Sequence, residues 1–77
     1  MDEKILTHIL NGNMVFIARD KDDDTLWLFT EQPTLNEETG EWKEAKGSEC
    51  MLLDDYDVFT SLNFEDGVLK AKLSIIE

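Results

Sequence analysis

The chain has 77 residues, of which 18 are aspartate or glutamate and 7 are lysine or arginine, so its formal net charge is −11 at neutral pH. This length excludes two separate hydrophobic cores, and we expect a single domain over residues 1–77. The charge repels nucleic acid and phosphate-rich membrane surfaces, which excludes both as expected direct partners, and it attracts basic protein surfaces or cations.

The negative charge is concentrated in the middle of the chain. Residues 20–66 hold 15 of the 18 acidic residues and three lysines, whereas the two ends are nearly neutral. The acidic residues gather in three clusters, at 20–24, 37–44 and 54–57. Such clusters form either one binding face or a scattered surface that keeps the protein in solution.

Residues 5–10 and 14–19 are two apolar runs joined by Asn11-Gly12-Asn13. Asn-Gly is a preferred pair for tight turns that need positive φ, so the segment predicts a first β-hairpin. A short helix over residues 5–10 is the alternative, because Ile5 and Ile9 are four residues apart, as are Leu6 and Leu10.

Residues 25–30 are rich in aromatic and β-compatible side chains and predict a strand after a bend at 20–24. Pro33 excludes a central position in a sheet for the residues around it. Residues 36–40 resemble a hairpin loop that ends on Gly40, where a left-handed residue is favoured. Residues 41–44 are then predicted to form a short edge strand.

The last third of the chain predicts two further strands. Residues 50–53 have the composition of a short buried strand, and apolar residues alternate with polar ones over 69–75, as in a half-buried strand. Between them, acidic residues at 54–57 suit a helix start, and Val58 and Leu62 are four residues apart. We therefore expect one short helical turn near 54–62.

Together these elements predict a mainly β fold, with a small α+β fold as the alternative. Five or six short antiparallel strands would form a hairpin meander or a small barrel-like sheet. Trp42 is the one aromatic residue expected at the surface, because most of the others are needed in the core of so small a domain.

A calcium loop is the sharpest local motif. Asp20, Asp22, Asp24 and Glu31 occupy positions 1, 3, 5 and 12 of an EF-hand register. Position 6, however, is Thr25 where glycine is required, and the flanking segments are predicted strands instead of helices. We therefore expect no metal site here, and no cofactor.

The residues for catalysis are sparse. The chain has one histidine, His8, and one cysteine, Cys50, without the spacing of a metal site or a catalytic pair. Cys50 lies in an apolar run and is expected in the core, where burial does not activate a thiol. We predict that the protein is not an enzyme.

The N-terminus and the cysteine content predict a location. The chain starts with acidic residues, and Thr7-His8 interrupts its first apolar run, unlike a secretory signal. A single cysteine forms no internal disulfide, and no apolar stretch reaches 18 residues. These features predict a cytoplasmic protein with no membrane contact.

Several short motifs carry a resemblance. Leu26-Trp27-Leu28-Phe29 with Pro33, Gly40-Glu41-Trp42, Asp57-Val58-Phe59 and the run 62–66 precede the last strand. This pattern, over residues 26–76, is similar to short proteins encoded by phages and prophages of bacteria. The resemblance implies a small β-rich protein and no particular functional residues, because that group has no assigned activity.

The function expected from these features is that of a small acidic protein-binding or inhibitor module that docks a basic partner. The alternative is a structural or assembly protein whose acidic loops only maintain solubility; the oligomeric state stays open. The binding interpretation is favoured if the three clusters lie on one face. The candidate partner-binding residues are Asp20, Asp22, Asp23, Asp24, Glu37, Glu38, Glu41, Trp42, Glu44, Asp54, Asp55 and Asp57.

Overall fold

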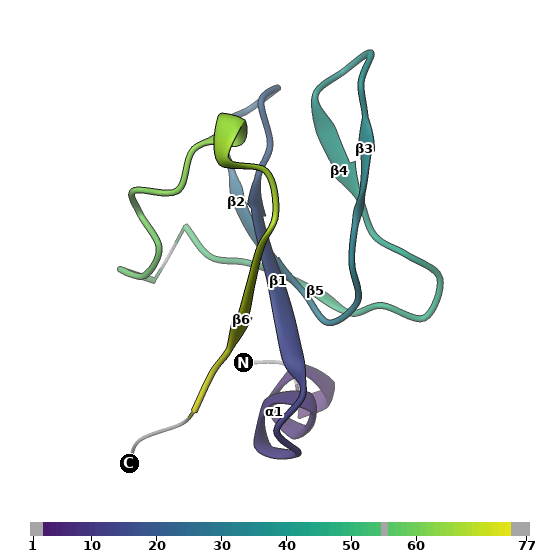
Figure 1. Ribbon diagram of the computed structural model, residues 1–77, viewed down its shortest axis with the longest axis vertical. Coiled ribbons are helices and arrows are strands. Elements are labelled where there is room, and N and C mark those ends of the chain that lie inside the picture. Colours follow the sequence, from purple (N-terminus) through teal and green to yellow (C-terminus); the bar gives the residue numbers. More distant parts are fainter. Residues whose placement is uncertain (1–2, 55, 75–77) are drawn as a thin grey trace.

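The computed structural model describes residues 3–54 and 56–74, which form a mainly β, single compact domain, as predicted (Figure 1). Within these residues there are six strands, one α-helix and one 3₁₀ helix. Their bounds are α1 Glu3–Leu10, β1 Met14–Arg19, β2 Leu26–Phe29, β3 Thr34–Asn36, β4 Glu41–Lys43, β5 Cys50–Leu52, η1 Phe64–Asp66 and β6 Leu69–Lys72.

All strand pairs are antiparallel, as predicted, and they form two sheets. The larger sheet has the order β5-β2-β1-β6, and β3 pairs with β4 in a separate hairpin. Strand β1 is therefore central, with β2 on one side and β6 on the other. The β3–β4 hairpin stands beside the larger sheet (Figure 1).

Helix α1 covers one face of the larger sheet, which we call the α1 face. Ile5 and Ile9 of α1 are buried against alternate residues of the strands, because side chains at i and i+4 share one side of a helix. The resulting core is aliphatic. It consists of Ile5, Ile9, Val15, Ile17, Leu26, Leu28 and Leu53.

The predicted hairpin over residues 5–19 is wrong, and the helical alternative is correct. The Asn11-Gly12 pair ends the helix instead of joining two strands: the N–H of Asn11 donates to the Thr7 carbonyl at 3.0 Å, and Gly12 has a φ of 78°. Both edges of β1 are taken by strands from later in the chain, so residues 5–10 cannot pair with it.

The helical turn predicted near 54–62 is displaced along the chain. Single hydrogen bonds join Tyr56 N–H to the Leu53 carbonyl and Leu62 N–H to the Phe59 carbonyl, and no helix forms among the described residues of this stretch. The helical turn is η1, which Asp66 stabilises by accepting the Asn63 N–H at 2.8 Å. The final strand ends at Lys72, and Ile75 lies outside the described residues.

The aromatic side chains contribute little to this core, contrary to expectation. Trp27 and Phe29 alternate with the core residues of β2 and point to the opposite face, which we call the hairpin face because the β3–β4 hairpin covers it. Cys50, paired with Phe29 in the sheet, is exposed instead of buried. Tyr56 is 44% exposed, so Trp42 is not the one aromatic residue at the surface.

Candidate functional site

Two of the three acidic clusters lie side by side at the end of the molecule opposite α1 (Figure 1). The N–H of Lys21, in the β1–β2 loop, donates to the carbonyl of Gly40, at the end of the β3–β4 loop, at 2.9 Å. The carboxylate Oδ1 of Asp20 accepts the N–H of Trp42 at 2.9 Å. These two bonds fix the loops to each other, so clusters 20–24 and 37–44 form one surface.

The 3₁₀ helix η1 adds Glu65 and Asp66 to this surface. Neither residue belongs to the three clusters that the sequence indicated. The ammonium of Lys21 lies 5.8 Å from the centre of the Phe64 ring, which places η1 beside the β1–β2 loop. The Asn63-to-Asp66 capping spacing is the signal that could have placed this turn. We call the combined surface the acidic end; its exposed carboxylates are Asp22, Asp23, Asp24, Glu37, Glu38, Glu41, Glu44, Glu65 and Asp66.

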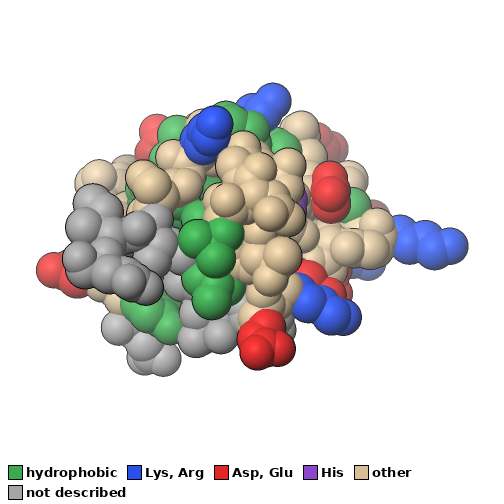
Figure 2. Space-filling view, turned by 90° about the horizontal axis from the view of Figure 1, so that it is seen from below, with side chains coloured by type: hydrophobic (Ala, Val, Ile, Leu, Met, Phe, Trp, Pro, Cys, Tyr) green, Lys and Arg blue, Asp and Glu red, His purple; other side chains and the backbone are tan. Residues whose placement is uncertain are grey.

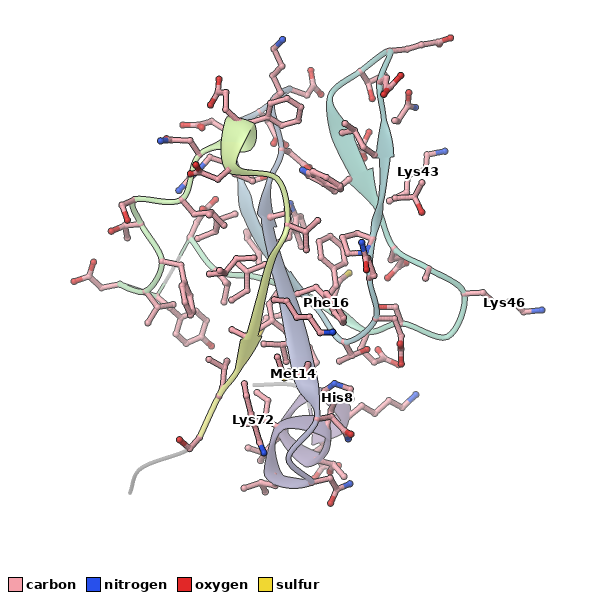
Figure 3. The ribbon with its side chains drawn as sticks, viewed as in Figure 1. His8, Met14, Phe16, Lys43, Lys46 and Lys72 are labelled. Carbon is pink, nitrogen blue, oxygen red and sulfur yellow. The ribbon has the colours of Figure 1, made fainter. Side chains whose placement is uncertain are left out.

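Lys21 and Lys43 belong to the two clusters of the acidic end, and the other lysines lie elsewhere (Figure 3). Lys46 and Lys72 are far from the acidic end, with Lys72 beside α1 (Figure 3). Seen from the α1 end, the surface carries basic and acidic side chains together (Figure 2). Exposed carboxylates therefore outnumber basic side chains at the acidic end.

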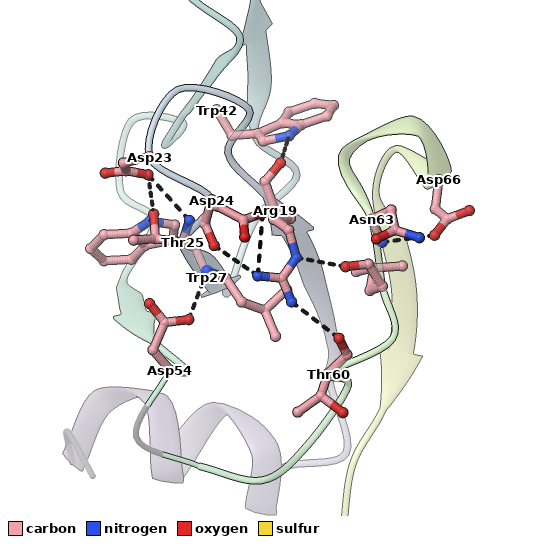
Figure 4. Close-up of polar contacts among 12 residues, drawn as sticks. Arg19, Asp23, Asp24, Thr25, Trp27, Trp42, Asp54, Thr60, Asn63 and Asp66 are labelled. Atoms are coloured by element: carbon pink, nitrogen blue, oxygen red, sulfur yellow. Dashed lines mark hydrogen bonds and ion pairs between the residues drawn. The ribbon is translucent and has the colours of Figure 1, made fainter.

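The third cluster is attached beside the β1–β2 loop and not to the β3–β4 hairpin (Figure 4). Asp54 accepts the Leu26 N–H through Oδ1 at 3.2 Å, which ties it to the start of β2 (Figure 4). Phe59 and Leu62, which follow the cluster, pack against the core on the α1 face, away from the β3–β4 hairpin. Asp57 is exposed in this same segment, and Asp55 lies outside the described residues.

Two carboxylates of the calcium register, those of Asp20 and Asp24, have other partners. Asp20 accepts the Trp42 N–H, and the Asp24 carboxylate lies 3.7 Å from the Arg19 guanidinium. Glu31 is exposed after β2. Over residues 3–54 and 56–74, no group of three or more histidine, cysteine or acidic side chains could hold a metal ion.

A pocket of about 350 Å³ lies beside the acidic end, between the β3–β4 hairpin and the hairpin face of the larger sheet. Both tryptophans of the chain line it, one from each sheet. We call it the Trp pocket. Its lining residues are Asp20, Trp27, Phe29, Glu41, Trp42, Lys43, Glu44 and Cys50.

Hydrogen bonds hold both indoles in place (Figure 4). The Trp42 ring N–H donates to the Arg19 carbonyl at 3.1 Å, and the Trp27 ring N–H donates to the Thr25 hydroxyl at 2.8 Å. The Phe64 ring packs against Trp42 with centroids 6.4 Å apart and a tilt of 49°. Because both ring donors are already used, the indoles offer the pocket their aromatic surface and no N–H group.

Two ionisable groups of the pocket have shifted pKa values. Asp20 is only 6% exposed, and burial raises the pKa of its carboxyl group, although the bond from Trp42 opposes this. Partial desolvation at the pocket wall, assisted by Glu44, raises the pKa of the Cys50 thiol to about 11. The thiol is therefore almost fully protonated at neutral pH, which disfavours a nucleophilic role.

We expect Asp20→Asn to leave the protein at least as stable as the wild type at pH 7. Asparagine keeps an oxygen that can accept the Trp42 N–H, but it removes a carboxylate that Asp23, Glu41 and burial all disfavour. A pKa raised above its usual 3.8 means that the folded protein binds this proton more tightly than the unfolded chain, so ionisation lowers stability as pH rises through the shifted pKa.

The advantage of Asp20→Asn should therefore shrink as the pH falls from the raised pKa toward about 4, and it should be lost below that pH, where the wild-type carboxyl is protonated in both states. Urea unfolding at pH 7 and at low pH measures this, with Asp57→Asn as an exposed control of equal charge change. A clear loss of stability at pH 7 would contradict the expectation and show that the charge of Asp20 supports the loop.

The contact between the two acidic loops predicts a difference between two glycine substitutions. Gly40 and Gly47 both have left-handed φ angles, 74° and 84°, so alanine is strained at either position. A Cβ at Gly40 would lie 2.6 Å from the Cβ of Lys21, whereas a Cβ at Gly47 meets nothing within 4 Å.

We expect Gly47→Ala to lower the free energy of unfolding by about 1 kcal/mol, and Gly40→Ala by about 2 kcal/mol. Urea unfolding of both variants checks this. Equal losses would mean that the loops do not pack closely in solution.

Comparison of the chain with protein-family models, curated proteins and solved structures gave no match. The resemblance to phage and prophage proteins therefore stays a prediction. Across the described residues, no helix combines the length and the apolar character needed to cross a membrane.

Proposed function

We propose that this protein is a small acidic binding or inhibitor module of the cytoplasm, and that its acidic end docks a basic surface of a partner protein. The observation that carries the proposal is the bonded contact between the β1–β2 and β3–β4 loops, made through Lys21 and Gly40. It joins acidic residues that are far apart in the sequence into one surface. The proposal is for a binding protein and not for an enzyme.

The composition of the acidic end supports a directed role. Nine exposed carboxylates gather there, and the two clusters contain two lysines, Lys21 and Lys43. Acidic residues needed only for solubility would work equally well if they were spread over the whole surface. A concentrated field instead steers a basic partner toward one end of the molecule and raises the association rate, at low salt above all.

The fixed positions of the loops also favour recognition. Asp20 is buried under the loops and accepts the Trp42 N–H, so the carboxylates around it are carried on a braced backbone. A surface that is ordered before binding loses less conformational entropy when a partner docks. Such a surface could cover a basic site that otherwise receives phosphates, which would make the module an inhibitor of nucleic-acid binding.

Affinity capture from a bacterial lysate tests the proposal when two matched variants are compared. The acidic-end variant combines Asp22→Asn, Glu37→Gln and Glu38→Gln. The control combines Glu3→Gln, Glu31→Gln and Asp57→Asn, which removes the same charge from exposed positions elsewhere. We expect the wild type and the control to capture the same basic proteins at low salt, and the acidic-end variant to lose them.

Equal capture by the two variants, or no basic protein in any eluate, would contradict the proposal. In that event the charge serves solubility alone. High salt should release the captured proteins, because exposed charge pairs are screened at short distances.

The edge strands favour assembly as a second candidate function. Among the described residues, β5 pairs only with β2 and β6 only with β1, so each has a free edge. Leu52 on β5 and Leu69 on β6 are exposed. Edge strands of this kind can pair with another copy of a chain. A defined oligomer in light scattering, stable over a range of protein concentrations, would favour this alternative.

A further inference from the structure

The Trp pocket offers aromatic surface that is not occupied by a cation of the protein. Lys21 lies 5.8 Å from the centre of the Phe64 ring, and Lys70 lies 5.9 Å from that of Phe16. Neither indole has such a partner among the residues that the structure describes, although tryptophan is the strongest aromatic acceptor for a cation. The two most favourable rings for a cation are thus left for a ligand.

The charges of the pocket also favour a cation. Asp20, Glu41 and Glu44 line it together with one lysine, Lys43, so its walls carry a net charge of −2 when these groups are ionised. The Oδ1 atom of Asp20 accepts the Trp42 N–H, and this is the one hydrogen bond that its carboxylate makes within residues 3–54 and 56–74. A carboxylate has the capacity to accept several more hydrogen bonds.

The residues that line the pocket favour a guanidinium group over an ammonium group. A guanidinium is planar, stacks on aromatic rings, and presents several N–H donors to a carboxylate. It is also more weakly hydrated than an ammonium, so less solvation is lost when it enters a pocket lined by two indoles. A volume of about 350 Å³ is at the lower end of the range for ligand pockets, which suits a single long side chain.

We propose that the Trp pocket binds the guanidinium group of an arginine side chain, stacked on Trp27 and Trp42 and hydrogen-bonded to Asp20. The inference rests on the proposed function, because the arginine belongs to the basic partner. Asp20 and Glu41 connect the pocket to the acidic end, so one partner surface reaches both. The acidic end then attracts the partner, and the pocket selects an arginine at a defined position.

A titration with short peptides tests the pocket without any partner protein. An acetylated and amidated Gly-Arg-Gly tripeptide is added to the full chain, and the indole N–H signals of Trp27 and Trp42 are followed by NMR together with tryptophan fluorescence. Both tryptophans of the chain line the pocket, so both signals should shift, with an affinity in the millimolar range. The same peptide with lysine should bind more weakly, and the peptide with uncharged citrulline should not bind.

Two variants locate the interaction. Asp20→Asn should weaken binding of the arginine peptide about tenfold. The charge-assisted hydrogen bond from the guanidinium is lost, whereas the bond from the Trp42 N–H can be kept. Asp54→Asn is the matched control: it removes the same charge from a residue that also accepts a backbone N–H but lies outside the pocket. It should leave the affinity unchanged.

Unshifted indole signals, an equal response to the citrulline or lysine peptide, or unchanged affinity in Asp20→Asn would each overturn the inference. These failures are distinct from failure of the proposed function. Basic proteins captured by the acidic end without binding of the arginine peptide would leave the docking proposal standing and remove the arginine pocket. Binding of the peptide without capture of any basic protein would leave the arginine pocket standing and remove the docking proposal.

Discussion

Replacing Arg19 with methionine should lower the free energy of unfolding by about 3 kcal/mol, although the residue takes no part in the proposed binding. The side chain of Arg19 is only 14% exposed. Its guanidinium donates to the carbonyls of Leu62 and Asp24, each at 2.7 Å, and of Thr60 at 3.3 Å (Figure 4). Methionine fills similar space but leaves all three carbonyls without this donor.

The loss should be large because Arg19 joins segments that are distant in the sequence. It connects the end of β1 to residues 60–62, and it holds Asp24, whose φ of 61° is unusual for a residue other than glycine. Arg19→Lys should give an intermediate loss, since an ammonium reaches fewer of the three carbonyls.

Urea unfolding measures these losses, with Lys46→Met as the control for removal of an exposed cation. We expect the control to change the stability by less than about 0.5 kcal/mol. If Arg19→Met and Lys46→Met behaved alike, the guanidinium would not brace residues 60–62 in solution.

Replacing Ile5 with alanine should lower the free energy of unfolding by a similar amount, about 3 kcal/mol. Ile5 is fully buried in the core between α1 and the sheet. Its truncation removes favourable contacts and leaves a cavity that the packed strands cannot close completely.

Leu10→Ala is the matched control, because Leu10 belongs to the same helix and is 65% exposed. We expect it to cost less than about 0.5 kcal/mol. Urea unfolding with circular dichroism gives both values. Similar losses at the two positions would contradict the docking of α1 through its Ile5 face.

Prediction from the sequence was most reliable for elements whose formation depends only on their own residues. The strand over 14–19 was predicted with the bounds that β1 has, and the aromatic strand at 25–30 differs from β2 only at its ends. The loop at 36–40 was also recognised, because Gly40 adopts the left-handed conformation that such a loop needs. These features depend on alternation and on local turn geometry.

The sequence was misleading where two local patterns compete. Residues 5–10 satisfy both a strand and a helix pattern, and the Asn11-Gly12 pair suits a hairpin turn as well as the end of a helix. The pairing of β1 with β2 and β6 decides between them, since it leaves no free edge for an earlier strand. The aliphatic residues fill the core on the α1 face. The tryptophans and Cys50 therefore lie on the hairpin face.

The candidate sites show the same difference between features set by local sequence and features set by long-range contacts. The sequence by itself determined that the protein is acidic, that the acidic residues occur in clusters, and that histidine and cysteine occur once each. Only the tertiary structure decided that clusters 20–24 and 37–44 meet, that η1 joins them, and that Trp27 and Trp42 face one pocket. The physical reason is that charge and periodicity are local properties, whereas the contacts of Lys21 with Gly40 and of Asp20 with Trp42 join residues about 20 positions apart.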